Sequence, residues 1–321
     1  MSNKLNQATA FAPATVANVA VGFDILGFAL DVAGDEVTVT RLAEREVRIT
    51  SIEAPDGLKL PTDPRKNTAT GGLFSMIERL SLDHGFEVSI RKGIALGSGM
   101  GGSAASAVAA GVAANALLDE PLSKEALLPF LLDGESIASG SRHADNIAPC
   151  LLGGMVLIRC LEPLDLISIP VPAGLHCVLA HPHAEVETRA ARAILAPSVE
   201  LKTMVAQSAN LAAFMAACFT GDLELMGRSL EDRIIEPQRA HLIPSFREAK
   251  RAAIHAGALG LSISGSGPSV FALARDAESA EQIRRALAQV YAEARMEVDL
   301  WAAPISQPGA RVVKSSQGVA R

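Results

Sequence analysis

Residues 97–107 read GSGMGGSAASA, a glycine-rich stretch that leads directly into a run of small helix-forming residues. Four glycines free the backbone here to turn its N–H groups toward one point: Gly97, Gly99, Gly101 and Gly102. The helix that follows directs the positive end of its dipole to the same place. The stretch therefore predicts an anion site of the kind that holds phosphates, with a glycine-rich packing loop as the alternative.

Two other phosphate-binding patterns fit this stretch less well. A Walker A loop has a lysine after its last glycine, whereas this chain has Ser103. Residues 97–102 match G-x-G-x-x-G, but a dinucleotide site also needs an acidic residue ending a strand about 20 residues further on. At that distance Asp119 and Glu120 stand at the end of a predicted helix. A nicotinamide-dependent oxidoreductase is therefore the weakest functional alternative.

The composition of the chain excludes several classes of protein. The 321 residues include 29 Lys and Arg against 35 Asp and Glu, a net charge of −6. A hydrophobic fraction of 49% with 20% charged residues is typical of a folded globular chain. An acidic balance with 4% aromatic residues disfavours nucleic-acid binding, which needs a basic surface and stacking platforms.

The cysteines and the apolar segments indicate a cytoplasmic protein. None of the four cysteines forms a C-x-x-C pair, which disfavours a zinc or redox site and suits a reducing compartment. The N-terminal segment lacks the apolar core of a signal peptide. Residues 93–118 carry no charge, but their first half is rich in glycine and serine, which predicts a buried loop and helix rather than a membrane span.

The order of predicted elements favours an α+β fold with two domains. Strands and helices alternate without strict βαβ repetition, and three prolines between residues 161 and 174 suggest a boundary. We expect domains at 1–165 and 166–321, with the final strand free to pack back on the first domain. Strands are predicted at 35–41, 45–52, 86–90, 153–160, 176–180, 259–264, 269–274 and 297–303, and helices at 67–80, 103–118, 123–140, 245–256 and 277–295; residues after 303 are predicted to be a polar tail.

Two further segments have unusual polar content. ISGSGPS (263–269) joins two predicted strands and is either a second ligand loop or a tight turn. APATVANVAVGFDILGFAL (12–30) is apolar except for Asn18 and Asp24. Burial without partners would cost these two side chains a few kcal/mol each, so they must meet either the rest of the protein or a ligand.

Together these segments resemble the three motifs of the GHMP superfamily of small-molecule kinases. The first is APAT-x-AN-x-x-x-GFD-x-x-G, the second is the loop usually written P-x-x-x-G-L-G-S-S-A-A, and the third is the C-terminal glycine loop. Order and spacing agree over nearly the whole chain. Ala95 and Gly102 depart from the second motif, which has a proline and a serine there. Neither change removes a backbone donor, so nucleotide binding is still expected.

Within that superfamily the chain resembles the branch that phosphorylates homoserine. The segments that carry this resemblance are GFDILG (22–27), GESIASGSRHADNIAPCLLGG (134–154), the T-x-x-x-R of Thr188 and Arg192, and EPQRAHLIP (236–244). The resemblance implies an N-terminal domain of ribosomal-S5 type that carries the ATP loop, a ferredoxin-like C-terminal domain and a homodimer. It also implies phosphorylation of L-homoserine to O-phospho-L-homoserine in threonine biosynthesis.

The same resemblance implies a nucleotide and metal site. Mg²⁺ prefers hard oxygen ligands, and the matching positions are Ser103 and Glu135; a helix cap and a solvated helix face are their alternatives. Asn67 matches a residue of the adenine pocket. The other positions expected to bind ATP are Ala95, Leu96, Gly97, Ser98, Gly99, Met100, Gly101, Gly102, Ser103, Ala104 and Ala105.

The chemistry of L-homoserine agrees with the matching substrate positions. Its carboxylate suits the guanidinium groups of Arg192 and Arg239, and its ammonium suits Asp24. A surface salt bridge is the alternative for either arginine. The remaining substrate positions implied by the resemblance are Asn18, Asn146 and Thr188, which can orient the hydroxyl, and His143.

The acceptor of the hydroxyl proton is left open by the sequence. Asp145 matches an aspartate described as a general base in several superfamily members, so it is one candidate. Phosphoryl transfer through a loose transition state needs little base strength, so late transfer to a γ-phosphate oxygen is the other and is favoured. Two functional rivals share the fold: a kinase for another small alcohol and a non-catalytic ligand sensor.

Overall fold

The two longest strands, β1 (Leu5–Ala17) and β2 (Leu26–Leu42), pair antiparallel and anchor the larger of two sheets. The apolar run at 12–30 therefore divides into the end of one strand, a turn and the start of the next. Their register shifts between Pro13 and Ala14, where proline cannot donate to the ladder. The computed structural model describes residues 5–54, 60–139, 143–306 and 308–317.

The larger sheet combines strands from both ends of the chain. Its order is β11-β1-β2-β4-β3, and β5 pairs with both β2 and β6. β3 and β4 are parallel, while the other pairs are antiparallel. The further bounds are β3 Val47–Glu53, β4 Gly85–Arg91, β5 Met155–Leu161, β6 Leu164–Ile169 and β11 Arg311–Gln317.

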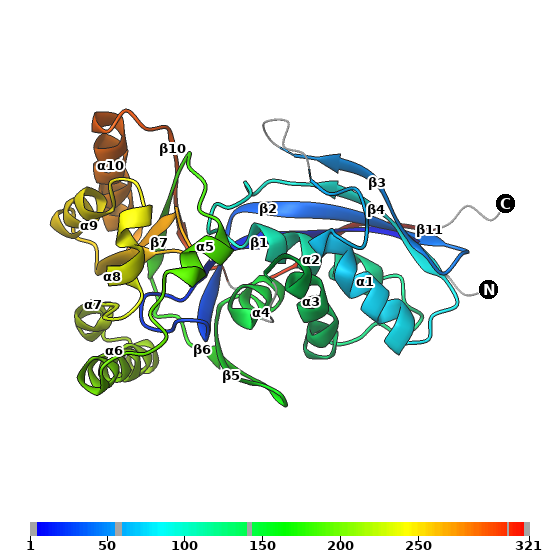
Figure 1. Ribbon diagram of the computed structural model, residues 1–321, viewed down its shortest axis with the longest axis horizontal. Helices are drawn as coiled ribbons and strands as arrows, with labels where there is room; N and C mark the ends of the chain where they lie inside the picture. The colour runs from blue at the N-terminus through cyan, green and yellow to red at the C-terminus, as the bar shows by residue number, and fades with distance from the viewer. Residues whose placement is uncertain (1–4, 55–59, 140–142, 307, 318–321) are drawn as a thin grey trace.

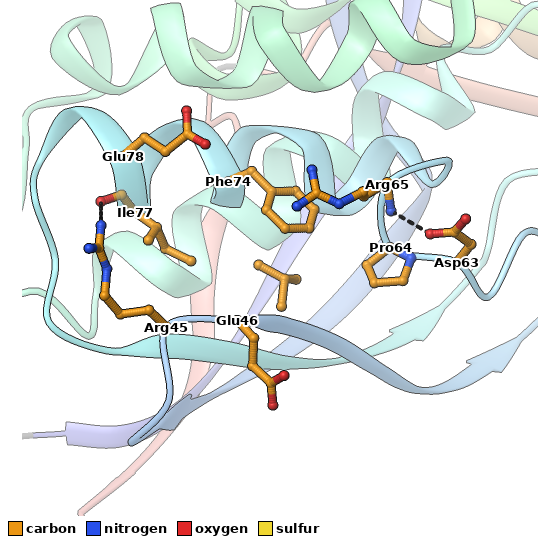
Figure 2. A pocket seen from close by; sticks show the side chains of 9 residues that line it. Arg45, Glu46, Asp63, Pro64, Arg65, Phe74, Ile77 and Glu78 are labelled. Atoms are coloured by element: carbon orange, nitrogen blue, oxygen red, sulfur yellow. Dashed lines mark hydrogen bonds between the residues drawn. The ribbon is translucent and has the colours of Figure 1, made fainter.

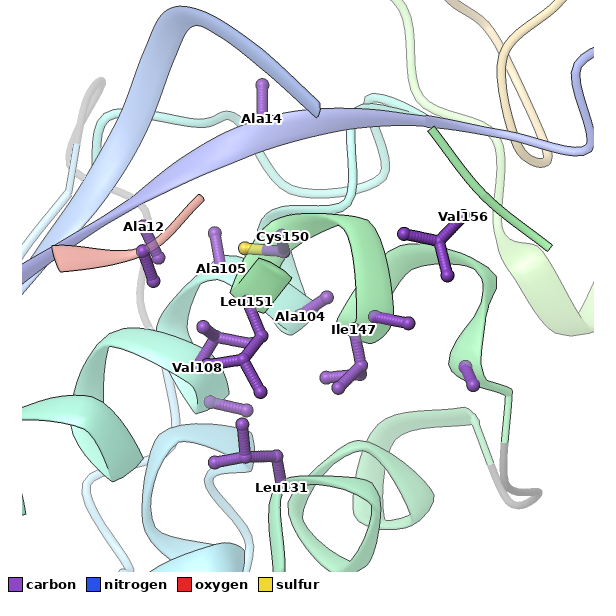
Figure 3. Packing of buried hydrophobic residues seen from close by; sticks show 14 of the residues in the cluster. Ala12, Ala14, Ala104, Ala105, Val108, Leu131, Ile147, Cys150, Leu151 and Val156 are labelled. Carbon is purple, nitrogen blue, oxygen red and sulfur yellow. The ribbon is translucent and has the colours of Figure 1, made fainter. Parts of the chain in front are cut away.

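Four helices cover one face of this sheet (Figure 1). They are α1 (Thr68–Arg79), α2 (Gly102–Asn115), α3 (Lys124–Ser139) and α4 (Ala144–Leu152). The central helix, α2, consists mostly of alanine, valine and glycine, and these small side chains let its neighbours pack closely on several sides. In Figure 3, Ala104, Ala105 and Val108 lie beside Ile147 and Leu151 of α4. This burial explains the uncharged run at 93–118.

The smaller sheet has the order β10-β7-β9-β8 and carries its own helices. α9 and α10 pack on it around Ala253, Ile283, Leu287 and Tyr291. None of the helices in the described residues is both long and apolar enough to cross a bilayer. The bounds are β7 His176–Pro182, β8 Gly260–Ile263, β9 Val270–Ala274, β10 Val298–Pro304, α5 Thr188–Ala193, α6 Leu201–Thr220, α7 Leu223–Ser229, α8 Glu236–Arg239, α9 Phe246–His255 and α10 Ala277–Glu293.

The path of the chain between the two sheets differs in detail from the prediction. The expected boundary at residues 165 and 166 falls inside β6, which belongs to the larger sheet, and the smaller sheet begins at β7. The strand expected at 297–303 is β10, and it pairs with β7. The return to the larger sheet is made instead by β11, in the segment predicted as a tail, because an edge strand can carry polar residues along its length.

Candidate active site

A cavity of about 430 Å³ lies where the three sequence motifs meet. It contains the glycine loop, the turn after β1, the start of α4, the segment that leads into α5, and the loop after β8. Of the residues predicted from the sequence, the cavity is lined by Asn18, Asp24, Ala95, Leu96, Gly97, Ser98, Gly99, Gly101, Gly102, Ser103, His143, Asp145, Asn146, Thr188, Arg192 and Arg239.

The glycine loop is held in place by the other two motifs. The carbonyl of Gly99 accepts a hydrogen bond from Ser264 Oγ at 2.7 Å, and that of Met100 accepts one from the Thr15 N–H at 3.1 Å. Gly99 and Gly101 have φ of 76° and 71°, a region that favours glycine. A Cβ at Gly101 would lie 2.0 Å from Thr15 Oγ1. Close packing and backbone conformation thus both require glycine here.

This packing leaves donors for a ligand. The N–H groups of Gly99, Met100 and Gly101 donate no hydrogen bond within the part of the chain that the structure describes. Ser98 is buried, and its Oγ also lacks a partner among those residues. Because buried polar groups are nearly always paired, the Ser98 hydroxyl indicates a polar or anionic ligand, and the partly buried loop N–H groups beside it are available to the same ligand at the N-terminus of α2.

A left-handed turn connects the first motif to the third. Asn18, Val19 and Ala20 have φ of 71°, 44° and 58°, which is strained for a β-branched residue such as Val19. The Asn18 side chain holds the turn: Nδ2 donates to the Gly265 carbonyl at 2.9 Å, and Oδ1 accepts from the Asp24 N–H at 3.0 Å. The turn thereby places Asp24, itself at φ 63°, at the edge of the cavity.

Asp24 and Arg192 form a two-point ion pair across the cavity. Arg192 Nη1 and Nη2 each donate to one carboxylate oxygen of Asp24 at 2.8 Å. Hydrogen bonding to Asp24 raises the pKa of Arg192, so the guanidinium stays charged. His143 Nδ1 lies 4.0 Å from Asp24 Oδ2, although burial lowers the pKa of this histidine. Thr188, at the start of α5, has its Oγ1 3.3 Å from Ser266 Oγ.

Arg239 is a buried cation that has no carboxylate partner among the described residues. Its side chain is 2% exposed, and it donates to the carbonyls of Ala191 at 2.9 Å and Gly265 at 3.3 Å. In the described residues it makes no ion pair, and burial, followed by the charge of Arg192, lowers its pKa. The Phe23 ring lies 5.3 Å from the Arg239 guanidinium and 5.2 Å from that of Arg192. Such a charge indicates that an anion binds beside it.

The start of α4 brings an acid and an amide to the cavity. Asp145 is 4% exposed, and burial, with a smaller contribution from Asp24, raises its pKa to about 7. Asn146 Oδ1 accepts a hydrogen bond from Thr15 Oγ1 at 2.6 Å, which leaves the amide NH₂ to face the cavity. The helix approaches β2 closely, since a Cβ at Gly27 would lie 1.9 Å from the Asp145 carbonyl oxygen.

Four of the predicted residues do not line the cavity, and the side chain of a fifth lies outside the part of the chain that the structure describes. Asn67 caps α1, with Oδ1 accepting from the Ala69 N–H and Nδ2 donating to Pro61, and it does not line the cavity. Met100, Ala104 and Ala105 are buried behind the loop. Ser103 lines the cavity in the first turn of α2. Glu135 belongs to α3, but its side chain lies outside the described part of the structure.

The structure adds residues that sequence reasoning did not select. Phe23 belongs to the GFD motif and Thr15 to the APAT motif, so both are part of the family pattern at 12–27. Glu185 precedes α5 without a motif, and its side chain packs over Gly97, where a Cβ would lie 2.5 Å from Glu185 Cγ. Arg189, in the first turn of α5, also lines the cavity.

A second groove, of about 450 Å³, lies between the start of β3 and α1 (Figure 2). Arg45 donates to the Ile77 carbonyl at 3.4 Å, and the Arg65 guanidinium lies 4.9 Å from the centre of the Phe74 ring. Charges of both signs line it, and no residue predicted for the site does. The first cavity is therefore the candidate active site.

Comparisons with known proteins identify the family of the chain. The family descriptions "GHMP kinases N terminal domain" and "GHMP kinases C terminal" match residues 67–154 and 214–293. A homoserine kinase from Xylella fastidiosa is 50% identical over 308 residues, covering 96% of this chain and 94% of that protein. One from Chloroherpeton thalassium is 47% identical over 320 residues, with 96% and 100% covered.

Solved structures lead to the same family. Homoserine kinase from Cytophaga hutchinsonii superimposes with a TM-score of 0.93 at 46% identity, covering 96% of this chain and 98% of that one. A mevalonate kinase from L. major shares the fold, with a TM-score of 0.70 at 16% identity over 93% and 96% of the two chains. The chain therefore belongs to the GHMP kinase family and, within it, to the homoserine kinases.

Proposed function

We propose that the chain transfers the γ-phosphoryl group of ATP to the side-chain hydroxyl of L-homoserine, a step of threonine biosynthesis. The bond between the γ-phosphorus and the β–γ bridging oxygen breaks, and a bond to the homoserine oxygen forms, giving ADP and O-phospho-L-homoserine. The names of the relatives support this reaction. The cavity supports it independently, because it contains a phosphate-type loop beside groups that match an amino acid.

The observation that carries the proposal is the buried Arg239 opposite the Asp24–Arg192 pair. A zwitterionic amino acid supplies a carboxylate to the two guanidinium groups and an ammonium to Asp24, so Arg239 gains an anionic partner beside the Asp24–Arg192 pair. A simple hydroxy acid would leave Asp24 without an ammonium partner. The Phe23 ring lies within 5.3 Å of both guanidinium groups, close enough for cation–π contact with each.

The glycine loop receives the phosphates of ATP. The N–H groups of residues 99–101 and the Ser98 hydroxyl, which have no partner within the described ranges, offer donors at the N-terminus of α2. Ser103, whose position in the first turn of α2 lines the cavity, and Glu135 are the proposed ligands of Mg²⁺, which commonly keeps several waters and takes one or two protein oxygens. When bound, the metal neutralises charge on the phosphate oxygens.

Asn146 orients the hydroxyl, and no strong base is required. Thr15 fixes the Asn146 amide by donating to its oxygen, which turns the NH₂ group to the reacting atoms. Asp145, with a pKa of about 7, is only partly ionised at neutral pH. In this proposal Asp145 positions charge near the hydroxyl, whose proton passes late to a γ-phosphate oxygen.

The proposal is tested with a panel of alcohols in an assay of ADP release. L-Homoserine is expected to give the highest kcat/KM, ahead of D-homoserine, L-serine, mevalonate and shikimate. Better turnover of mevalonate or shikimate would overturn the substrate while leaving the kinase class intact. Tight binding of L-homoserine without ADP release would instead favour a sensor.

We also propose a cytoplasmic homodimer. All four cysteines are free thiols, which suits a reducing compartment. α6 exposes several large apolar side chains, which supports an interface on this helix: Leu201, Met204, Val205 and Phe219. Sedimentation equilibrium measures the state directly. A monomer for the wild type, or a dimer that persists in a Val205→Glu variant, would contradict an interface at α6.

A further inference from the structure

A buried ion pair lies beneath the glycine loop and outside the cavity. Asp35, in β2, is fully buried, and Lys92, directly after β4, is 7% exposed. The Lys92 ammonium contacts Asp35 Oδ2 directly. Ser106, in α2, completes the cluster, because its Oγ donates to Asp35 Oδ2 at 2.6 Å and accepts from Lys92 Nζ at 3.0 Å. None of these three side chains has a place in the proposed reaction.

The cluster joins the two ends of the loop. On the near side, Asp35 Oδ1 accepts hydrogen bonds from the N–H groups of Gly93 at 3.0 Å and Ile94 at 3.2 Å. On the far side, Lys92 Nζ donates to the carbonyl of Gly102 at 2.7 Å, at the first residue of α2. Residues 93–94 and residue 102 are therefore connected through one ammonium and one carboxylate.

Stability alone does not account for charges at this position. Ile94, whose N–H donates to Asp35, is buried, and so are Ala105 and Ala107, the neighbours of Ser106 in α2. Taking two charges out of water offsets most of their attraction, so a packed apolar pair would stabilise the fold about as well. Unlike an apolar pair, the ion cluster makes directional hydrogen bonds, and these hold particular backbone atoms of the loop at fixed positions.

We infer that Asp35, Lys92 and Ser106 are positioning residues that hold the glycine loop ready for ATP. By connecting the two ends of the loop, they keep the N–H groups of residues 99–101 turned outward before the nucleotide arrives. The loop is then already ordered before ATP binds, so the entropic cost of ordering it does not reduce the binding free energy. The inference rests on the proposed function, because it requires that the loop binds ATP.

The test compares nucleotide binding with homoserine kinetics in matched variants. Lys92→Met breaks the connection and leaves Asp35 charged. The double variant Asp35→Asn/Lys92→Met breaks it without leaving a buried charge, so folding is preserved. Lys124→Met is the control, because Lys124 Nζ also donates to a backbone carbonyl, that of Leu151 at 2.8 Å, but away from the loop.

Calorimetry with ADP and Mg²⁺ measures nucleotide affinity without any phosphoryl transfer. We expect the dissociation constant for ADP to rise about tenfold or more in both Lys92 variants, a change equivalent to about 1.4 kcal/mol. The KM for L-homoserine and kcat at saturating ATP should stay within about threefold of wild type. Hydrogen exchange in residues 93–106 should be faster in the free variants and slow again with ADP. Lys124→Met should match wild type in all four measurements.

The results separate a failure of this inference from a failure of the proposed function. An unchanged dissociation constant for ADP in the folded double variant overturns the inference, as does a rise in the KM for L-homoserine equal to the rise in the dissociation constant for ADP. If the double variant does not fold, Ser106→Ala decides, because it removes the hydroxyl that contacts both charges and should weaken ADP binding about threefold. Wild-type protein that fails to bind ADP would overturn the proposed function itself, whereas an active wild type with an unaffected double variant overturns only the role of the cluster.

Discussion

Replacing Arg239 with methionine separates binding of the substrate carboxylate from stability. Methionine keeps much of the side-chain length against Phe23 but removes the charge. A charge-assisted hydrogen bond contributes about 1.5–3 kcal/mol, so the KM for L-homoserine should rise roughly 10- to 150-fold. The KM for ATP should change less than about threefold, because Arg239 contacts the Ala191 and Gly265 carbonyls and not the glycine loop.

The effect of the same change on stability should be small. Arg239→Met removes two hydrogen bonds to backbone carbonyls, which lowers the free energy of unfolding. It also removes a buried cation that has no carboxylate partner among the described residues and whose pKa is lowered by burial. Removal of this charge raises the free energy of unfolding. We therefore expect a Tm within a few degrees of wild type, measured by calorimetry.

The assay is a steady-state measurement of ADP release with two acceptors. 3-Aminopropan-1-ol is homoserine without its carboxylate, so it cannot use Arg239. Wild-type enzyme should turn it over far less efficiently than homoserine, and Arg239→Met should not reduce that rate further. An equal loss of kcat/KM on both acceptors, or an equal rise in the KM for ATP, would refute a carboxylate contact and point to a folding role.

Three further predictions concern the acid, the metal and the loop. Because the pKa of Asp145 is raised to about 7 in the folded protein, the contribution of Asp145 to stability should be lost as pH rises from about 4 to 7. Asp145→Asn should therefore raise the free energy of unfolding by a few kcal/mol at pH 8 and hardly at pH 4. Equal Tm gains at both pH values would show that burial does not shift this pKa. If the reaction needs no strong base, Glu135→Gln should lower kcat more than Asp145→Asn; a loss of about 10³-fold or more for Asp145→Asn with about tenfold for Glu135→Gln would assign Asp145 as the base. Gly101→Ala should raise the KM for ATP and lower Tm more than Gly221→Ala, since both have positive φ but only Gly101 would clash, with Thr15 Oγ1 at 2.0 Å; similar Tm losses would contradict the packing argument.

Much of the site could be predicted from the sequence because its chemistry is local. The glycine loop carries its own conformational requirement, and the helix after it supplies the dipole, so residues 97–107 indicated a phosphate site before any long-range contact was known. Asn18 and Asp24 were singled out as polar groups within an apolar run, and they do contact the rest of the cavity. The secondary structure was least predictable at β11, because its polar residues at a sheet edge have no buried face to produce a pattern.

The sequence by itself determined the class of ligand and the family, because those depend on residue types at short spacing. Only the tertiary structure decided which charges meet. Asp24 and Arg192 are separated by 168 residues and form a two-point ion pair, whereas Arg239 remains buried without a carboxylate in the described part of the chain. Lys92 likewise could not be distinguished from a surface lysine until the pairing of β2 with β4 placed it beside Asp35. Ion pairing and burial depend on distance in space, and the strand pairing that sets those distances involves residues far apart in the chain.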